Sequence, residues 1–252
     1  VMALGLCSVS WAEGEGEGGT TPPASTTVVA KIGEQGYATL QAAINAASDG
    51  GNTVVVLLND LTESITVAKE KSITLDLSGY TLTNEAGKHT ITNYGDLTIT
   101  STGVVDNVSH ACAALYNAPD ALATLNGGTF DRSHEAGKNA DDAGGNSYYT
   151  IKNFGEMVVN SGVTVQQDGT SIGGTKGKFS SLFANGWQSV STAGQQGKEP
   201  AHTKDAVLTI NGGTFIGGLN TVKNDDCGVM TINGGEFKNF AQACVQNHNE
   251  LT

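Results

Sequence analysis

Apolar and polar residues alternate with a period of two over much of the chain. In the eight-residue motif Leu208-Thr-Ile-Asn-Gly-Gly-Thr-Phe215, the side chains of Leu208 and Ile210 fall on one side of an extended backbone and Thr209 on the other. The motif recurs from Met230, so its period is 230 − 208 = 22 residues, and a third copy begins at Ala123. Glycines after the asparagine allow a tight turn. The pattern therefore predicts repeated short strands separated by turns.

A second short strand, which ends in asparagine, precedes each copy of the motif. These asparagines are Asn93, Asn117, Asn153, Asn185, Asn224 and Asn247. Two motifs in a fixed order, with one Asn-Gly-Gly turn per repeat, favour stacked coils of parallel strands over hairpins or propeller blades.

Stacked coils place equivalent side chains in columns along the interior. We expect one column of Phe130, Phe215 and Phe237, one of aliphatic residues at positions 97, 125, 159, 210 and 232, and one of the six asparagines. A buried asparagine amide can bond to backbone groups of its own coil and of the next coil.

A short helix is predicted near the start of the repeats. Residues 39–47 place Leu40, Ala43 and Ile44 on one helical face, with Thr39 as the N-cap and Gly50-Gly51 as the stop. Such a helix would cover the apolar end and the unpaired edge of the first coil. Residues 53–58, 64–67 and 72–77 follow as predicted strands.

Two segments carry a family resemblance. Residues 37–47 and the stretch Ser72-Ile-Thr-Leu-Asp-Leu-Ser-Gly-Tyr-Thr-Leu82 resemble the opening of pectin-lyase-like right-handed β-helix proteins. The Leu-Thr-Ile-Asn-Gly-Gly-Thr-Phe repeats look like those of large, adhesin-like secreted surface proteins of Gram-positive bacteria. The resemblance spans residues 30–252 and implies an all-β, single-stranded, right-handed parallel β-helix with an N-terminal capping helix. This fold hosts lyases, hydrolases and adhesins, so it implies no single activity.

The ends of the chain suggest export. Residues 1–12 are expected to be a truncated signal peptide, and residues 13–29 a flexible acidic linker rich in Gly, Pro and Thr. The apolar run at the start is far shorter than the roughly 18 residues that span a membrane. The chain ends inside a further repeat, so more coils are expected in the parent protein. We therefore expect a secreted or cell-surface location and no membrane span in residues 1–252.

Charge narrows the class of partner. The chain has 13 Lys and Arg against 25 Asp and Glu, a formal net charge of −12. Nucleic-acid binding needs a basic surface, so nucleic acid is excluded as a partner. An anionic polymer would also be repelled unless metal ions bridged it.

Candidate catalytic residues define an alternative function. Asn224-Asp225-Asp226-Cys227 resembles the Asp-Asp-Cys segment of polygalacturonase-type hydrolases, although the companion motifs Asn-Thr-Asp, Gly-His-Gly and Arg-Ile-Lys are missing. Arg132, the single arginine, is the candidate base of a polysaccharide lyase. These residues, Asp225, Asp226 and Arg132, would carry a carbohydrate-active enzyme. The function that we predict first is instead a non-catalytic module, which has no catalytic residue and no cofactor.

Three inserted stretches interrupt the 22-residue spacing of the repeats, at 131–147, 166–181 and 187–205. Loops on a rigid scaffold often carry binding residues. Trp187 and Tyr148 are candidates to stack on sugars, and Asp141 and Asp142 are candidate ligand-binding residues with hard oxygen atoms suited to Ca²⁺. We expect adhesion or binding to a glycan or to a host or neighbouring-cell surface protein.

Cysteine chemistry stays open. Cys227 and Cys244 form a disulfide in an oxidising setting or remain small buried thiols.

Overall fold

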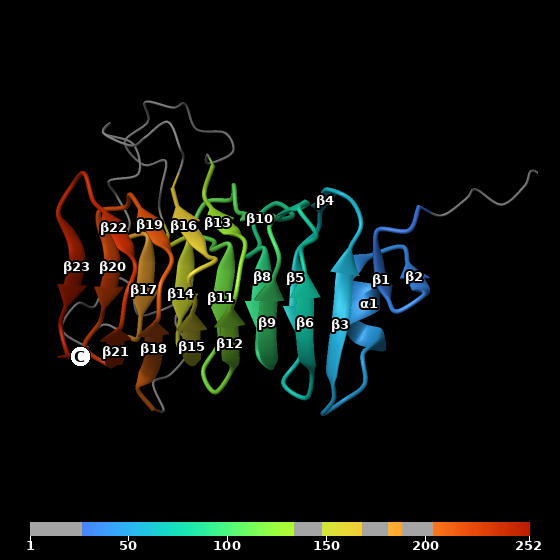
Figure 1. Ribbon diagram of the computed structural model, residues 1–252, viewed down its shortest axis with the longest axis horizontal. Coiled ribbons are helices and arrows are strands. Elements are labelled where there is room, and N and C mark those ends of the chain that lie inside the picture. Colours follow the sequence, from blue (N-terminus) through green and yellow to red (C-terminus); the bar gives the residue numbers. More distant parts are fainter. Residues whose placement is uncertain (1–26, 134–147, 168–180, 188–203) are drawn as a thin grey trace, which may run out of the picture.

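The computed structural model describes residues 27–133, 148–167, 181–187 and 204–252. These residues form one long stack of short strands, which runs in sequence order from β1 to β23 along the longest axis of the molecule (Figure 1). The strands of the described residues belong to three sheets of ten, seven and seven strands. The single described helix, α1 (Leu40–Ala46), lies at the N-terminal end of the stack.

The three sheets are built from strands that are far apart in sequence. The first sheet contains, in spatial order, β2 (Gln35–Tyr37), β1 (Ala30–Ile32), β3 (Asn52–Leu57), β6 (Ser72–Asp76), β9 (Asp96–Thr100), β12 (Leu122–Leu125), β15 (Glu156–Val159), β18 (Ala206–Ile210), β21 (Gly228–Ile232) and β24 (Glu250–Leu251). The second contains β4 (Leu61–Thr62), β7 (Thr81–Thr83), β10 (Val104–Asp106), β13 (Thr129–Asp131), β16 (Thr164–Gln166), β19 (Thr214–Ile216) and β22 (Glu236–Lys238). The third contains β5 (Ile65–Val67), β8 (Ile91–Asn93), β11 (Leu115–Asn117), β14 (Ile151–Asn153), β17 (Phe183–Asn185), β20 (Asn220–Asn224) and β23 (Ala243–Asn247).

From β3 onward the chain visits the first, second and third sheets in rotation, and we call each such circuit a coil. Equivalent strands of successive coils pair in parallel; in the first sheet, for example, Leu97 of β9 pairs with Ala123 of β12. The antiparallel pairs between named strands join β1 to β2 and β1 to β3, at the N-terminal end. The prediction of an all-β fold with long parallel sheets is therefore confirmed.

Inward side chains form the columns that the repeat predicts. Phe130, Val165, Phe215 and Phe237 occupy equivalent positions on four successive strands of the second sheet. The rings of Phe215 and Phe237 stack with their centroids 4.8 Å apart. The predicted phenylalanine column is confirmed, with a valine between its first two rings.

The predicted aliphatic column contained one error of register. Leu125 pairs with Ile99 and not with Leu97, which belongs to the adjacent inward column with Ala123. Both Leu97 and Ile99 are fully buried. Because alternate residues of a strand share a face, alternation alone cannot tell these two positions apart.

The asparagine ladder is continuous through six coils. The amide Nδ2 of each asparagine donates to Oδ1 of the next, at 2.7–2.9 Å, from Asn93 to Asn247. Each amide from Asn93 to Asn224 also donates to a backbone carbonyl of the first-sheet strand that follows the next asparagine of the ladder, such as that of Val207 for Asn153. The first five asparagines are buried. The ladder therefore satisfies backbone groups that would otherwise be buried without partners.

The two glycines of each Asn-Gly-Gly turn have different roles. The second glycine, such as Gly128 or Gly213, has a positive φ of 87° or 102°. The first, Gly127, is needed because a Cβ there would lie 2.5 Å from the carbonyl oxygen of Ser101 in the preceding coil. Close stacking of the coils therefore selects glycine as strongly as the turn does.

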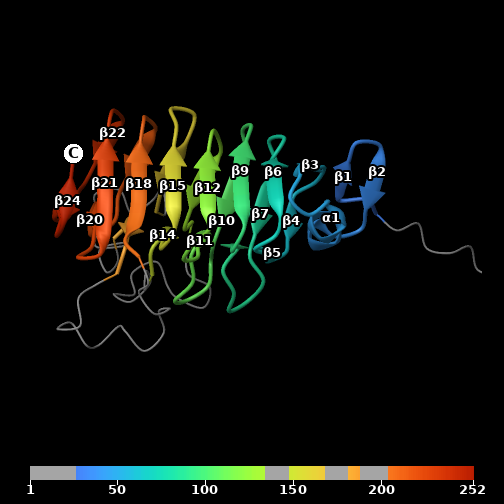
Figure 2. The ribbon, with the colours of Figure 1, turned by 90° about the horizontal axis from the view of Figure 1, so that it is seen from below.

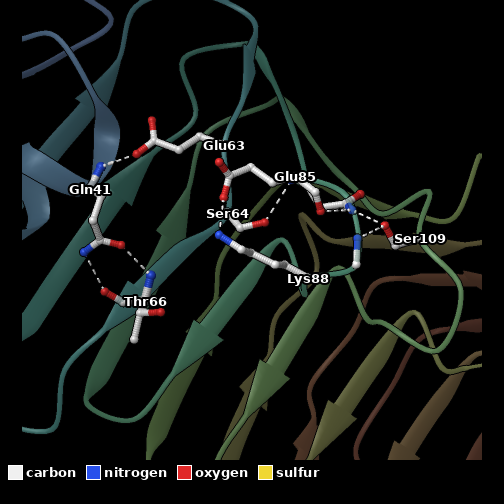
Figure 3. A network of polar contacts seen from close by, with 9 residues as sticks. Gln41, Glu63, Ser64, Thr66, Glu85, Lys88 and Ser109 are labelled. Atoms are coloured by element: carbon white, nitrogen blue, oxygen red, sulfur yellow. Dashed lines mark hydrogen bonds and ion pairs between the residues drawn. The ribbon is translucent and has the colours of Figure 1, made fainter.

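The N-terminal end is closed by side-chain bonds as well as by the helix (Figure 3). Thr39 is the N-cap of α1, as predicted, and its hydroxyl accepts from the Ala42 N–H. The helix ends at Ala46, before the predicted glycine stop. Glu63 accepts from the N–H groups of Leu40 and Gln41 at 2.9 and 2.8 Å.

Gln41 covers the edge of the third sheet. Its side-chain amide donates to the carbonyl of Thr66 on β5 at 3.0 Å and accepts from the Thr66 N–H at 2.7 Å. One side chain thus takes the place of a neighbouring strand on an otherwise open edge.

The outer face of the first sheet is a regular row of strands (Figure 2). Its central outward column contains Thr74, Thr98, Thr124, Val158 and Thr209 in register. Each of these side chains is half-buried by its neighbours in the column.

Candidate binding site on the outer face of the third sheet

The outer face of the third sheet differs from that of the first because its middle is buried. The outward column runs through Tyr116, Lys152, Ala184, Lys223 and Gln246 on β11, β14, β17, β20 and β23. Lys152 and Ala184 are fully buried, and Lys223 is half-buried. The short side chain of Ala184 leaves room over β17 for the lysine that precedes it in the column.

Lys152 lies across that space. Its Nζ donates to the carbonyl of Gly186 at 2.7 Å and lies 3.5 Å from Oδ2 of Asp225. The same amine lies 4.5 Å from the ring centroid of Phe154 and 4.9 Å from that of Tyr149. Aromatic faces attract a cation at these distances, most strongly where water is excluded.

Asp225 lies between two amines. Nζ of Lys223 is 2.5 Å from its Oδ1, and Lys152 approaches the other oxygen. Asp225 is 2% exposed, so its carboxylate is almost sealed from solvent. Buried ions are costly to desolvate, and removing one partner of such a group leaves an uncompensated charge.

An aromatic cluster extends from this charged group along the face. Phe154 packs against Trp187 with ring centroids 4.5 Å apart and against Tyr116 at 5.6 Å. Tyr148 packs edge-on against Tyr149 at 5.2 Å. Trp187 is buried, whereas Tyr116, Tyr148 and Tyr149 are half-buried. The three tyrosines are therefore partly accessible to solvent, beside a buried Phe154–Trp187 pair.

His89 joins the tyrosines into one surface. Its ring stacks on Tyr116 at 4.8 Å and lies 5.8 Å from Tyr148. Nδ1 accepts from the Ala113 N–H at 2.8 Å. Burial, and secondarily the charge of Arg132, lower the pKa of His89 to about 4. The ring is therefore neutral at pH 7, with its proton on Nε2.

The structure brings several of the predicted site residues onto this face. Trp187 and Tyr148 belong to the aromatic cluster, and Asp225 is at the centre of the charged group. Asp226 follows it and is half-buried. The candidate residues Asp141 and Asp142 lie outside the described residues.

Arg132 lies at the end of β13 and is 2% exposed. Its Nη1 donates to the carbonyl of Cys112, and its Nη2 donates to that of Ser109 at 3.1 Å. The guanidinium therefore holds the backbone of residues 109–112 in place.

Of the two alternatives for Cys227 and Cys244, a disulfide or two buried thiols, the structure has neither, because the pair is not bonded and Cys244 is exposed, with Cys227 half-buried. Both residues, and Cys112, are free thiols. Burial, followed by the charges of Asp205, Asp226 and Asp225, raises the pKa of the Cys227 thiol. Because the thiolate is the reactive form, Cys227 is a weak nucleophile at neutral pH.

Over the described ranges, no group of three or more His, Cys, Asp or Glu side chains is placed to hold a metal ion. Nor is any described helix long and apolar enough to cross a membrane.

Sequence reasoning missed Lys152, His89, Tyr116 and Tyr149. The sequence signal for Tyr116 and Lys152 was their place in the repeat. The middle residue of each third-sheet strand points outward, and it is tyrosine in β11, lysine in β14 and alanine in β17.

No protein-family model, curated protein or solved structure matches the chain.

Proposed function

We propose that the chain is a single right-handed parallel β-helix that serves as a non-catalytic glycan-binding module of a secreted or cell-surface protein. The handedness rests on a general rule: connections between parallel strands of one sheet are right-handed in about 98% of cases. Here every such connection passes through the other two sheets. The export and surface location rest on the signal-like and linker-like composition of residues 1–29.

The half-exposed rings of Tyr116, Tyr148 and Tyr149 around His89 are the observation that carries the binding function. Tyrosine combines an apolar ring face with a hydroxyl that forms hydrogen bonds, a combination suited to the apolar faces and hydroxyl groups of sugars. Neutral His89 offers an Nε2 donor beside them. The buried packing of Phe154 and Trp187 fixes the cluster from below, so a ligand would order few side chains on binding.

Charge favours a neutral glycan. The chain carries a formal charge of −12, which repels uronic-acid polymers and sulfated glycans at low salt. Lys152, which lies beside Tyr149, does not counter this repulsion because it is fully buried, and Lys223 is paired with Asp225.

The alternative, a carbohydrate-active enzyme using Asp225, Asp226 or Arg132, gains little from the geometry. A general acid or base must come within hydrogen-bond distance of the substrate. Asp225 and Arg132 are each 2% exposed, and both already bond to protein groups.

Binding to neutral oligosaccharides, measured by calorimetry across a glycan panel, tests the proposal. Replacing Tyr148 and Tyr149 by alanine removes two rings, each contributing about 0.5–1.5 kcal/mol, so affinity should fall about fivefold or more. Tyr94→Ala is the matched control, because Tyr94 is 48% exposed in the turn before β9. Unchanged affinity in the double variant, or an equal loss in the control, would refute this site. Sugar release in the same reactions would favour the enzyme instead.

A further inference from the structure

Lys152 and Asp225 are positioned as reactants as well as an ion pair. We propose that Nζ of Lys152 and Cγ of Asp225 become joined by an intramolecular amide bond, a spontaneous modification of the folded chain. The proposal goes beyond glycan binding and does not depend on it.

The two oxygens of Asp225 differ in a way that suits this reaction. Oδ1 is held by the ammonium of Lys223 at 2.5 Å. Oδ2 is buried, accepts no hydrogen bond from any described residue, and lies 3.5 Å from Nζ of Lys152. Oδ1 is therefore the carbonyl oxygen of the reacting acid, and Oδ2 is the oxygen that leaves.

The amine is oriented by its other neighbours. One N–H of Lys152 donates to the carbonyl of Gly186 at 2.7 Å, and the rings of Phe154 and Tyr149 occupy a second side at 4.5 and 4.9 Å. A neutral amine has two N–H bonds and one lone pair. In the reacting form, one N–H of the amine stays on the Gly186 carbonyl and the lone pair is the group that attacks Asp225.

The reacting species are the neutral amine of Lys152 and the neutral acid of Asp225. Lys152 and Asp225 have side chains that are 0% and 2% exposed, and two ions in such a site each carry a large desolvation cost. Transfer of one proton from the Lys152 ammonium to Oδ2 removes both charges. Lys223, whose side chain is 11% exposed, keeps its charge.

The reaction is a condensation that needs no further reagent. The Lys152 lone pair attacks Cγ and forms the C–N bond, while negative charge develops on Oδ1 beside the Lys223 ammonium. An amine proton then passes to the Oδ2 hydroxyl, the Cγ–Oδ2 bond breaks, and one water molecule leaves. Well-oriented intramolecular reactions reach effective molarities of about 10⁵–10⁸ M, and the closed site gives little access to water for the reverse step.

The product would tie together two coils that are not adjacent. Lys152 lies on β14 and Asp225 directly follows β20, with β17 between them. The bond would cross over Ala184 and fasten the base of the aromatic cluster.

The mass of the wild-type protein tests the proposal directly. Intact-mass measurement under denaturing conditions should give a protein lighter than its sequence by one water molecule. Proteolysis should then release a branched peptide that contains Lys152 and Asp225. The branched peptide also distinguishes the amide from dehydration of a single aspartate, which leaves the peptide linear.

Variants assign the reacting groups. Lys152→Met and Asp225→Ala should restore the full mass, and Lys223→Met should slow the appearance of the mass deficit at least tenfold. Lys71→Met is the matched control, because Lys71 pairs with Asp49 at 2.6 Å but Asp49 is 67% exposed; this variant should keep the deficit. Full sequence mass in the folded wild-type protein, or a branch point at Lys223, would overturn the proposal.

Discussion

The cost of replacing an asparagine of the ladder should depend strongly on where that asparagine lies in the stack. Asn153 lies in its middle, where Nδ2 donates to Oδ1 of Asn185 at 2.7 Å and to the carbonyl of Val207 at 3.1 Å. Its Oδ1 accepts from the Gly155 N–H at 3.2 Å and from Asn117. Asn153→Leu keeps a similar volume but removes all of these bonds.

Besides Nδ2 of Asn117, which still donates to the Glu156 carbonyl, three groups lose a partner in that variant: Oδ1 of Asn185, the Val207 carbonyl and the Gly155 N–H. An unsatisfied buried polar group costs about 1–3 kcal/mol. At the lower half of that range, the three together lower the free energy of unfolding by about 3–6 kcal/mol. Such a loss is comparable with the whole stability of many domains.

Asn247→Leu provides the comparison at the end of the ladder. Asn247 is exposed, accepts from Asn224 at 2.9 Å and donates to the Asn249 carbonyl. Water can replace these bonds, so the expected loss is less than about 1 kcal/mol. Guanidinium unfolding followed by far-ultraviolet circular dichroism measures both variants. Equal losses in the two variants would refute the reasoning, because they would show that burial does not set the value of the ladder.

Three further predictions concern pH, packing and the cap. The pKa of His89 is lowered from 6.5 to about 4, so between these pH values only the unfolded chain gains the proton. The free energy of unfolding should therefore fall by roughly 3 kcal/mol as the pH drops from 6.5 to 4. In urea titrations at several pH values, His89→Gln should remove that part of the pH dependence. Gly155→Ala drives a Cβ into the Ala121 carbonyl oxygen and should cost at least about 2 kcal/mol. Gly51→Ala should change the melting temperature little, because its Cβ would make only an ordinary contact with Ser48 Cβ, at 4.0 Å. Glu63→Gln leaves one N–H of the first turn of α1 without its acceptor and should lower the free energy of unfolding by about 1 kcal/mol; an unchanged thermal midpoint would show that Glu63 does not cap the helix.

The repeating parts of the fold were predictable from sequence because each coil repeats the same short strand and turn motifs. The asparagine ladder, the phenylalanine column and the Thr39 cap all follow from short motifs whose geometry is set within a few residues. The assignment of Leu97 failed because Leu97 and Ile99 both point inward, and only pairing with Ala123 and Leu125 distinguishes them.

The site was less predictable because its chemistry depends on residues far apart in sequence. An outward lysine on a strand normally indicates a solvated position. Lys152 is buried because Ala184 leaves space on the next strand and Asp225 is positioned one strand beyond that. Trp187 was predicted as a candidate for sugar stacking, and its packing against Phe154 places it under the tyrosine surface. Long side chains that reach across coils, such as Gln41 onto β5, likewise leave no local pattern.

The winding of the chain through three parallel, in-register sheets is the claim on which the site and the ladder depend. Cysteine pairs on the outer face of the first sheet test it most directly. Thr98 and Thr124 are neighbours on β9 and β12, whereas Thr98 and Val158 are separated by β12. Neighbouring strands lie about 4.8 Å apart and a disulfide spans Cα atoms about 4.4–6.8 Å apart. With Cys7, Cys112, Cys227 and Cys244 replaced by alanine, mild oxidation should cross-link the Thr98→Cys/Thr124→Cys variant and not the Thr98→Cys/Val158→Cys variant. Cross-linking of the second pair, without the first, would contradict the fold described here.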